Sequence, residues 1–210
     1  MALIHTLILN AGGIRSLVAL GTLMSQEPVT RVALLHVRGG GSASRTQRVR
    51  QQVSHYDLRT VVEVEPARVE IKRGERPDPA ADPVLPRTRL LASAVAVALQ
   101  LRAERIVWPV QTGTGFEAVA QMTELLVAIQ QVVRLEQGNC PVIQTPMLEW
   151  TDQQMMELGV QLGVPWQMAW SCVNATDQPC RVCPGCRRRQ AAFASVAQSD
   201  PLLGLPAARV

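Results

Sequence analysis

Aromatic side chains and lysine are scarce in this chain of 210 residues. Phe, Trp and Tyr together make up 3% of it, and Lys72 is the one lysine among 21 basic residues. Hydrophobic residues still reach 47%, so the core must be built from Ala, Val, Leu and Ile. Charged residues make up 18%, which is too few for an intrinsically disordered chain. The composition predicts a globular protein with one ordinary domain and at most a small appendage.

Long apolar runs, a secretory signal and histidine pairs are also missing. No apolar run approaches the roughly 20 residues of a membrane span, and residues 1–9 lack the basic segment that begins a signal peptide. We therefore expect a cytoplasmic protein with reduced thiols and no membrane partner. His5, His36 and His55 lack metal-ligand spacing, so a histidine-based hydrolase or metalloenzyme has no support. His36, near the end of a predicted strand, is a candidate to line a pocket.

The net charge of +4 is mildly basic and comes almost wholly from arginine. An arginine excess often reflects the base composition of the genome, so it is a weak sign of a nucleic-acid partner. On charge alone we do not expect such a partner.

Strand-like and helix-like segments alternate along the chain. The strand-like segments are short, β-branched and nearly continuous in apolar character, as parallel strands covered on both faces are. They lie at 5–9, 32–37, 60–64, 105–110 and 142–145. The predicted helices span 14–24, 43–54, 87–103, 117–136, 151–162 and 187–198. This alternation predicts an α/β fold with a doubly wound, mostly parallel five-stranded sheet and right-handed crossovers.

Two segments interrupt the alternation. Residues 66–86 contain five prolines, which predicts a long surface loop. From Pro165 onward the alternation stops and a cysteine-rich segment begins. We therefore divide the chain into an α/β core at 1–164, a small subdomain with the last helix at 165–198, and a tail at 199–210.

Four of the five cysteines lie within fifteen residues, in the pattern Cys172-x7-Cys180-x2-Cys183-x2-Cys186. Four thiolates at such spacings can surround one Zn²⁺ at about 2.3 Å each, which makes a closed structural site. An iron–sulfur cluster also uses cysteines at x2 spacing, and two disulfides would need an oxidising compartment, so both stay open as alternatives. Cys140 stands apart and is expected to be a buried small hydrophobe.

A second signal is the turn between the first predicted strand and helix, Asn10-Ala11-Gly12-Gly13-Ile14-Arg15-Ser16. Glycines at the carboxyl end of a strand let the backbone approach an anion, and the free amides of the next helix attract negative charge. The turn is not a P-loop, because no Lys-Ser/Thr pair follows, and it lacks G-x-G-x-x-G spacing. Its position at a strand end predicts a phosphate site, with a plain tight turn as the alternative.

Three further segments complete a recognisable arrangement, namely Leu85-Pro86-Arg87-Thr88, Ser171-Cys172-Val173, and Arg189 with Phe193 after the last cysteine. Together with the glycine turn they resemble the 7-cyano-7-deazaguanine synthase (QueC) family of PP-loop ATP pyrophosphatases, over nearly the whole chain. The resemblance implies a PP-loop fold and Zn²⁺ at the four cysteines. It also implies a nucleotide site made by Asn10, Ala11, Gly12, Gly13, Arg15, Ser16 and Arg87.

The resemblance further implies an ATP-dependent ligase of the queuosine pathway. Such an enzyme adenylates the carboxylate of 7-carboxy-7-deazaguanine, forms an amide with ammonia and dehydrates that amide to the nitrile. ATP and Mg²⁺ would be the cofactors of the active enzyme, and a nucleotide or deazapurine its small-molecule partner. Related enzymes commonly form homodimers.

The chain departs from the family pattern in two places. Ala11 and Arg15 stand where the family has a serine and an aspartate, and an arginine can bind phosphate but not Mg²⁺. The family's acidic substrate motif is missing at 111–117. These differences motivate a second hypothesis, a relative that binds nucleotide or deazapurine without turnover. A third is a nucleic-acid-binding zinc module using residues 187–189. These three arginines are expected to offset the charge of the thiolates, with a phosphate or nucleic-acid contact as the alternative.

Overall fold

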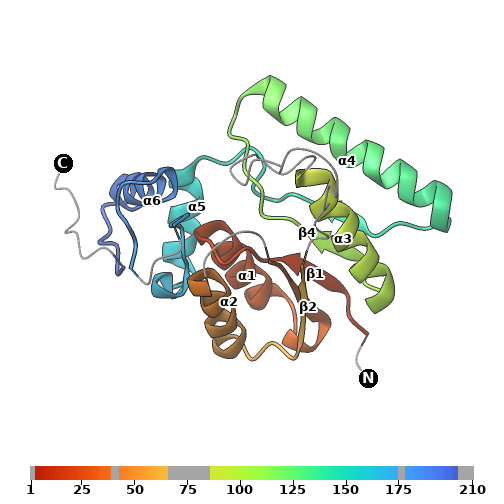
Figure 1. Cartoon of the computed structure of the whole chain (residues 1–210), viewed down its shortest axis with the longest axis horizontal. Helices are drawn as coiled ribbons and strands as arrows, with labels where there is room; N and C mark the ends of the chain where they lie inside the picture. Colours follow the sequence, from red (N-terminus) through yellow and green to blue (C-terminus); the bar gives the residue numbers. More distant parts are fainter. Residues whose placement is uncertain (1–2, 39–42, 66–85, 175–177, 203–210) are drawn as a thin grey trace, which may run out of the picture.

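The computed structural model describes residues 3–38, 43–65, 86–174 and 178–202 of the protein. Strands and helices alternate in it in the predicted order (Figure 1). The strands are β1 (Thr6–Leu9), β2 (Val32–Val37), β3 (Thr60–Val64), β4 (Arg105–Val107) and β5 (Val142–Gln144). The helices are α1 (Ile14–Gln26), α2 (Ala43–His55), α3 (Pro86–Leu101), α4 (Phe116–Gln137), α5 (Asp152–Gln161) and α6 (Pro184–Ser195), with 3₁₀ turns η1 (Val29–Arg31) and η2 (Trp166–Met168).

The five strands form one parallel sheet in the order β3-β2-β1-β4-β5, which confirms the predicted doubly wound fold. In its centre Ile8 of β1 is in register with Leu34 of β2 and Val107 of β4. The chain runs outward from β1 to β3 and then returns to the other side of β1 with β4. The sheet order therefore reverses between β1 and β4, and ligands of such folds bind at the carboxyl ends of strands at this point.

Aliphatic side chains cover both faces of the sheet. Ile8, Leu34 and Val107 pack with α1, α2 and α5 on one face. Leu7 and Ile106 point to the opposite face, against α3 and α4 (Figure 1). Every residue of β1 is buried, as a central parallel strand requires. The core is thus aliphatic, as the low aromatic content predicts.

Most element boundaries lie within two residues of the sequence prediction, and the end of β4 and both ends of α6 differ by three residues. β4 ends at Val107 rather than at residue 110, because Pro109 has no N–H to continue the ladder. α6 begins at Pro184 rather than at residue 187. Cys183 caps α6, since its sulfur accepts a hydrogen bond from the backbone of Cys186 at 3.4 Å, and Pro184 suits the first helical position.

Several expectations lie partly or wholly outside the described residues. The proline-rich loop predicted at 66–86 falls there except for Pro86, which begins α3. The division into core, subdomain and tail stays a prediction, although Phe193 of α6 belongs to the same apolar cluster as Val18 of α1. Within the ranges that the structure covers, no helix combines the length and apolar character needed to cross a membrane.

Candidate functional site

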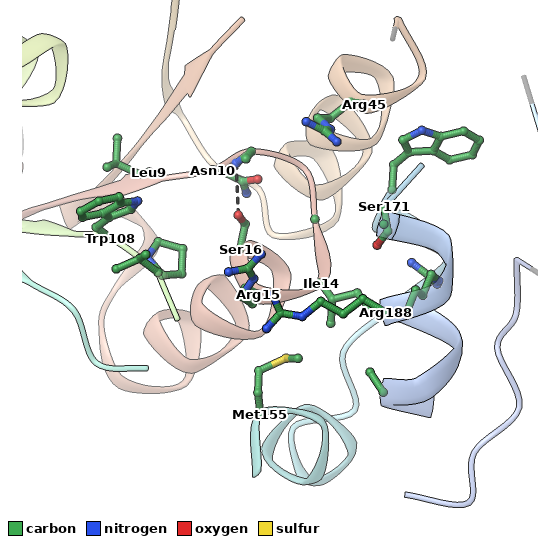
Figure 2. A pocket seen from close by; sticks show the side chains of 18 of the residues that line it. Leu9, Asn10, Ile14, Arg15, Ser16, Arg45, Trp108, Met155, Ser171 and Arg188 are labelled. Carbon is green, nitrogen blue, oxygen red and sulfur yellow. Dashed lines mark hydrogen bonds between the residues drawn. The ribbon is translucent and has the colours of Figure 1, made fainter. Parts of the chain in front are cut away.

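A cavity of about 330 Å³ lies at the carboxyl ends of β1, β2 and β4, where the sheet order reverses. Its walls come from the glycine turn and α1 on one side and from α5 and α6 on the other. Leu9 and Trp108 form an apolar end of the cavity, whereas Arg15 and Arg188 lie between α1 and α6 at the other end (Figure 2). The cavity therefore offers an apolar wall for a ring and a cationic region for an anion.

The glycine turn is held by its own side-chain hydrogen bonds. The Asn10 side chain accepts from the Gly12 backbone at 2.7 Å and donates to Gln52 of α2 at 2.8 Å. Gly12 has a φ of +74°, and a Cβ there would lie 2.8 Å from Cγ and 2.9 Å from the carbonyl oxygen of Arg45. Only glycine fits this position, because both the backbone conformation and the close approach exclude a side chain.

Backbone amides at the start of α1 face the cavity without a side-chain cap. Gly13 is the N-cap residue, and the first turn of α1 contains no acidic residue. The Ser16 hydroxyl accepts a hydrogen bond from the Ala11 backbone at 3.1 Å (Figure 2). A helix N-terminus of this kind carries a partial positive charge and can donate hydrogen bonds to an anion.

His36 supports the turn from behind instead of lining the cavity. It is buried, and its Nδ1 lies 2.8 Å from the carbonyl oxygen of Asn10 and its Nε2 3.2 Å from Oγ1 of Thr46. Both ring nitrogens thus have partners. The prediction that His36 lines the pocket is therefore wrong, because the side chain points beneath the loop.

Four arginines line the cavity, Arg15, Arg45, Arg188 and Arg189. Burial and the nearby charge of Arg188 lower the pKa of Arg15, and Asp152 offsets part of this effect. Burial likewise lowers the pKa of Arg45, whose Nε atom has no hydrogen-bond partner among the described residues. Because burial penalises uncompensated charge, these groups would gain from an anionic ligand.

Arg188 is fixed by a two-point contact with Asp152 at the start of α5. Its Nε and Nη2 atoms each donate to a carboxylate oxygen of Asp152 at 2.7 Å, and Nη2 also lies 3.3 Å from the Gln111 side chain. The hydrogen bond to Asp152 raises the pKa of Arg188. Sequence reasoning missed Arg45 and Asp152 as site residues, because only long-range packing brings α2 and α5 to the turn. It considered Arg188 only as part of the basic run at 187–189.

Arg189, the fourth arginine of the cavity wall, is held by hydrogen bonds within the fold. It is fully buried and donates to both carboxylate oxygens of Asp200, at 2.7 and 2.9 Å. It also donates to the carbonyl oxygens of Ala169 and Trp166, at 2.7 and 3.1 Å. The expectation that Arg188 and Arg189 offset the thiolate charge is therefore wrong, since each is paired with a carboxylate.

Most residues predicted for nucleotide binding meet at the cavity. Arg87 is the exception, since it is exposed on the first turn of α3 and is not among the residues that line the walls. Gly12 does not line the cavity either, but its backbone conformation shapes the glycine turn. Lining positions are held by Asn10, Ala11, Gly13, Arg15 and Ser16.

The four clustered cysteines converge in space. Their Sγ atoms all lie within 4.8 Å of one another, and those of Cys172 and Cys183 are 3.9 Å apart. A tetrahedron with 2.3 Å metal–sulfur bonds has edges of about 3.8 Å, so this donor set fits one tetrahedral metal ion. All four thiols are free, with no disulfide between them. Cys140 is also free, but it is half-buried rather than buried as expected, because it lies in the loop before β5.

The thiols of the cluster have different proton affinities. In Cys183, burial is outweighed by hydrogen bonds from the backbone of Val173 and Cys186, which lower its pKa to about 6. Burial and the neighbouring thiols raise the pKa of Cys186 to about 12. Such a cluster holds both a ready thiolate and a thiol that must lose its proton before it can ligate a metal.

The cysteine cluster and the glycine turn are joined through the backbone. The Trp170 N–H donates to the Gly12 carbonyl oxygen at 2.7 Å, two residues before Cys172. Gly185, between two cysteines on α6, lies so close to this segment that a Cβ would be 1.9 Å from the Ser171 carbonyl oxygen. The position of the turn therefore depends on the fold of the cysteine segment.

Comparison with known proteins identifies the family. The family model described as queuosine biosynthesis protein QueC matches residues 83–197, which is more than half of the chain. The 7-cyano-7-deazaguanine synthase of Trichormus variabilis is 36% identical over 120 residues, which cover 55% of this chain and 53% of the relative. That of Methanoculleus marisnigri is 34% identical over 115 residues, 54% of this chain and 52% of the relative.

The matched segments cover only part of each relative. The alignments span about half the length of these curated relatives. One similar solved structure is the U34-tRNA thiolase NcsA from Methanococcus maripaludis with its [4Fe-4S] cluster. The superposition includes 91% of this chain and 65% of that chain, at 14% sequence identity and a TM-score of 0.49. That structural likeness is too low to bear on shared chemistry. Because the family model covers α3 to α6 and all four clustered cysteines, this chain belongs to the QueC family of queuosine biosynthesis proteins.

Proposed function

We propose that this protein is a QueC-type synthase, which uses ATP to convert the carboxylate of a 7-carboxy-7-deazaguanine to the amide and then to the nitrile. The observation that supports the proposal is the cavity at the switch point of the sheet, in a chain of this family. It combines an apolar wall at Trp108 with Arg15 and Arg188 beside the uncapped start of α1. A planar deazapurine suits the apolar wall, and phosphates suit the cationic end.

The proposed chemistry has two activations. The substrate carboxylate oxygen attacks the α-phosphorus of ATP and pyrophosphate leaves, and ammonia then displaces AMP to give the amide. The amide oxygen attacks the α-phosphorus of a second ATP, with loss of pyrophosphate and one amide proton, after which AMP and the second proton leave and the nitrile forms. In each step the protein's own groups would hold the phosphates and stabilise their charge, through Arg15, Arg188 and the α1 amides.

We also propose Zn²⁺ as the ion of the cysteine cluster. Cys172, Cys180, Cys183 and Cys186 would hold it, and the closed four-sulfur site would supply a structural cross-link and no reactive position. The ion would fix the segment that donates to the Gly12 carbonyl oxygen. Elemental analysis of purified protein decides between zinc and iron–sulfur, because only the latter brings iron and sulfide in equal amounts with a visible absorption band.

A second candidate function is binding without turnover. Arg15 favours it, because this cation lies in the cavity where the family pattern has a carboxylate. Such a protein would still bind a nucleotide or a deazapurine, as a subunit or regulator of another enzyme. We also propose a homodimer, which would be compatible with either function.

The test is a product assay with a binding control. Purified protein is incubated with ATP, ammonia, Mg²⁺ and 7-carboxy-7-deazaguanine, and AMP and the nitrile are measured by mass spectrometry. Formation of both products above a protein-free blank supports the synthase. Calorimetric binding of ATP without any product supports the second candidate. If neither product nor binding of ATP, AMP or the deazapurine is found, both candidates fail.

A further inference from the structure

The cavity carries more positive charge than its own side chains neutralise. Asp152 is the one carboxylate among the described residues that line it, and both of its oxygens accept hydrogen bonds from Arg188. Arg15 and Arg45 form no ion pair with a described residue, and the Nε atom of Arg45 is buried without a partner there. The cavity wall therefore presents two guanidinium groups without a direct ion pair, with Asp152 near Arg15 and the sulfur of Cys172 near Arg45.

This donor set does not fit a magnesium ion. Mg²⁺ prefers hard oxygen ligands, and proteins usually hold it with one or two carboxylates together with water and substrate phosphates. Here Asp152 is engaged by Arg188, and the guanidinium of Arg15 lies beside that pair, with Arg188 extending toward it (Figure 2). A divalent cation at this place would meet fixed positive charges, so its binding would be opposed.

We propose that this cavity binds the phosphate groups of its nucleotide as a metal-free anion, with the guanidinium groups of Arg15 and Arg188 in place of a divalent cation. This inference rests on the proposed function, because it takes the ligand to be a nucleotide. Guanidinium groups match phosphate oxygens with paired hydrogen bonds, and the uncapped amides of α1 add donors to the same region. Bound phosphate would also give Arg15 and Arg45 the direct ion pair that neither forms with a described residue.

The test compares ATP binding with and without magnesium. The metal-loaded protein is titrated with ATP by calorimetry in buffer freed of divalent cations by a chelating resin, and again after addition of millimolar MgCl₂. We expect binding in both buffers, with dissociation constants that differ by less than about threefold. Binding that requires Mg²⁺, or that strengthens about tenfold or more with it, overturns the inference and leaves the proposed function standing. Absence of binding in both buffers overturns the inference and the proposed nucleotide site together.

Substitution of Arg15 supplies an independent result. Arg15→Gln keeps the length and polarity of the side chain but removes its charge, and it should weaken magnesium-free ATP binding about 10- to 100-fold. Arg15→Asp should bind ATP only when Mg²⁺ is added. Arg134→Gln, at an exposed site on α4 away from the cavity, is the matched control and should bind as the unmodified protein does. If Arg15→Gln binds like this control in magnesium-free buffer, Arg15 does not have the role inferred here.

Discussion

Single residues determine how the two sites of this protein are built. Gly185 lies between the last two cysteines of the cluster, and Arg189 follows the last of them by three residues. Arg189 ties α6 to Asp200 and to the backbone before Cys172, and Gly185 permits the contact with Ser171. Both residues stabilise the packing of α6 against its neighbours, and these roles can be recognised only in the folded structure.

Loss of Asp200 should destabilise the fold strongly. Asp200→Ala leaves the buried guanidinium of Arg189 without its counter-charge, so the free energy of unfolding should fall by about 3 to 5 kcal/mol. Urea denaturation followed by circular dichroism measures this change. Glu124→Ala removes an exposed carboxylate on α4 and should change stability little. Equal stability of the two variants would contradict the structural role of the pair.

A side chain at Gly185 should disrupt the cysteine segment. Gly185→Ala would bring a methyl group within 1.9 Å of the Ser171 carbonyl oxygen, so α6 or the segment must move. We expect a loss of about 1 to 3 kcal/mol in stability and weaker retention of the metal during dialysis. Gly115→Ala is the control, since a Cβ there meets no atom within 4 Å. Normal metal content and stability in Gly185→Ala would contradict the described packing.

Helices and strands can be predicted from the sequence where the pattern of buried residues alone determines them. The strands β1 and β2 are predictable from continuous apolar runs, and the helices from their flanking turns. The start of α6 could not be predicted in the same way, because Cys183 serves both as a candidate ligand and as the helix cap. The cationic wall was equally hidden, since Arg45, Asp152 and Arg188 come from three elements that meet only in the packed structure.

Removal of the metal should weaken nucleotide binding at a distance. The cysteine segment donates from Trp170 to Gly12, so melting of the N-terminal turn of α6 would displace the glycine turn. After chelation, or in Cys180→Ser, ATP affinity should fall at least about fivefold. Cys140→Ser, which alters the cysteine outside the cluster, is the control. Unchanged ATP affinity in metal-free, still-folded protein would show that the two sites are independent.

The affinity of the cysteine cluster for its metal should rise with pH. The pKa of Cys186 is raised to about 12, so near neutral pH its thiol must release a proton when the metal binds. Cys183, with a pKa of about 6, is already mostly a thiolate at pH 7. Affinity should therefore fall at least about tenfold when the pH is lowered from 8 to 7. Competition with a chromogenic chelator at several pH values measures it, and a flat profile would contradict the assignment.

At the scale of the whole molecule, the chain combines an α/β fold built on a parallel sheet with a cysteine cluster that holds the glycine turn in place. The matched family region covers the cluster and α3 to α6, whereas the glycine turn with Ala11 and Arg15 lies before it. The cysteine segment, which lies in the matched family region, thus holds a glycine turn whose sequence differs from the family pattern. By the resemblance drawn from the sequence, Arg15 replaces an acidic group of the family by a cation, and the surrounding cavity is cationic as well.

The central claim is that this cationic cavity binds the phosphates of a nucleotide, and Arg188 offers the most direct test of it. Calorimetric titration of the metal-loaded protein with ATP should give saturable binding at one site per chain, and Arg188→Gln should weaken it about 10- to 100-fold. Because Arg188 is half-exposed, this variant should keep its fold, which circular dichroism checks. Heats of titration that match dilution into buffer, or equal affinity in Arg188→Gln, would contradict the claim.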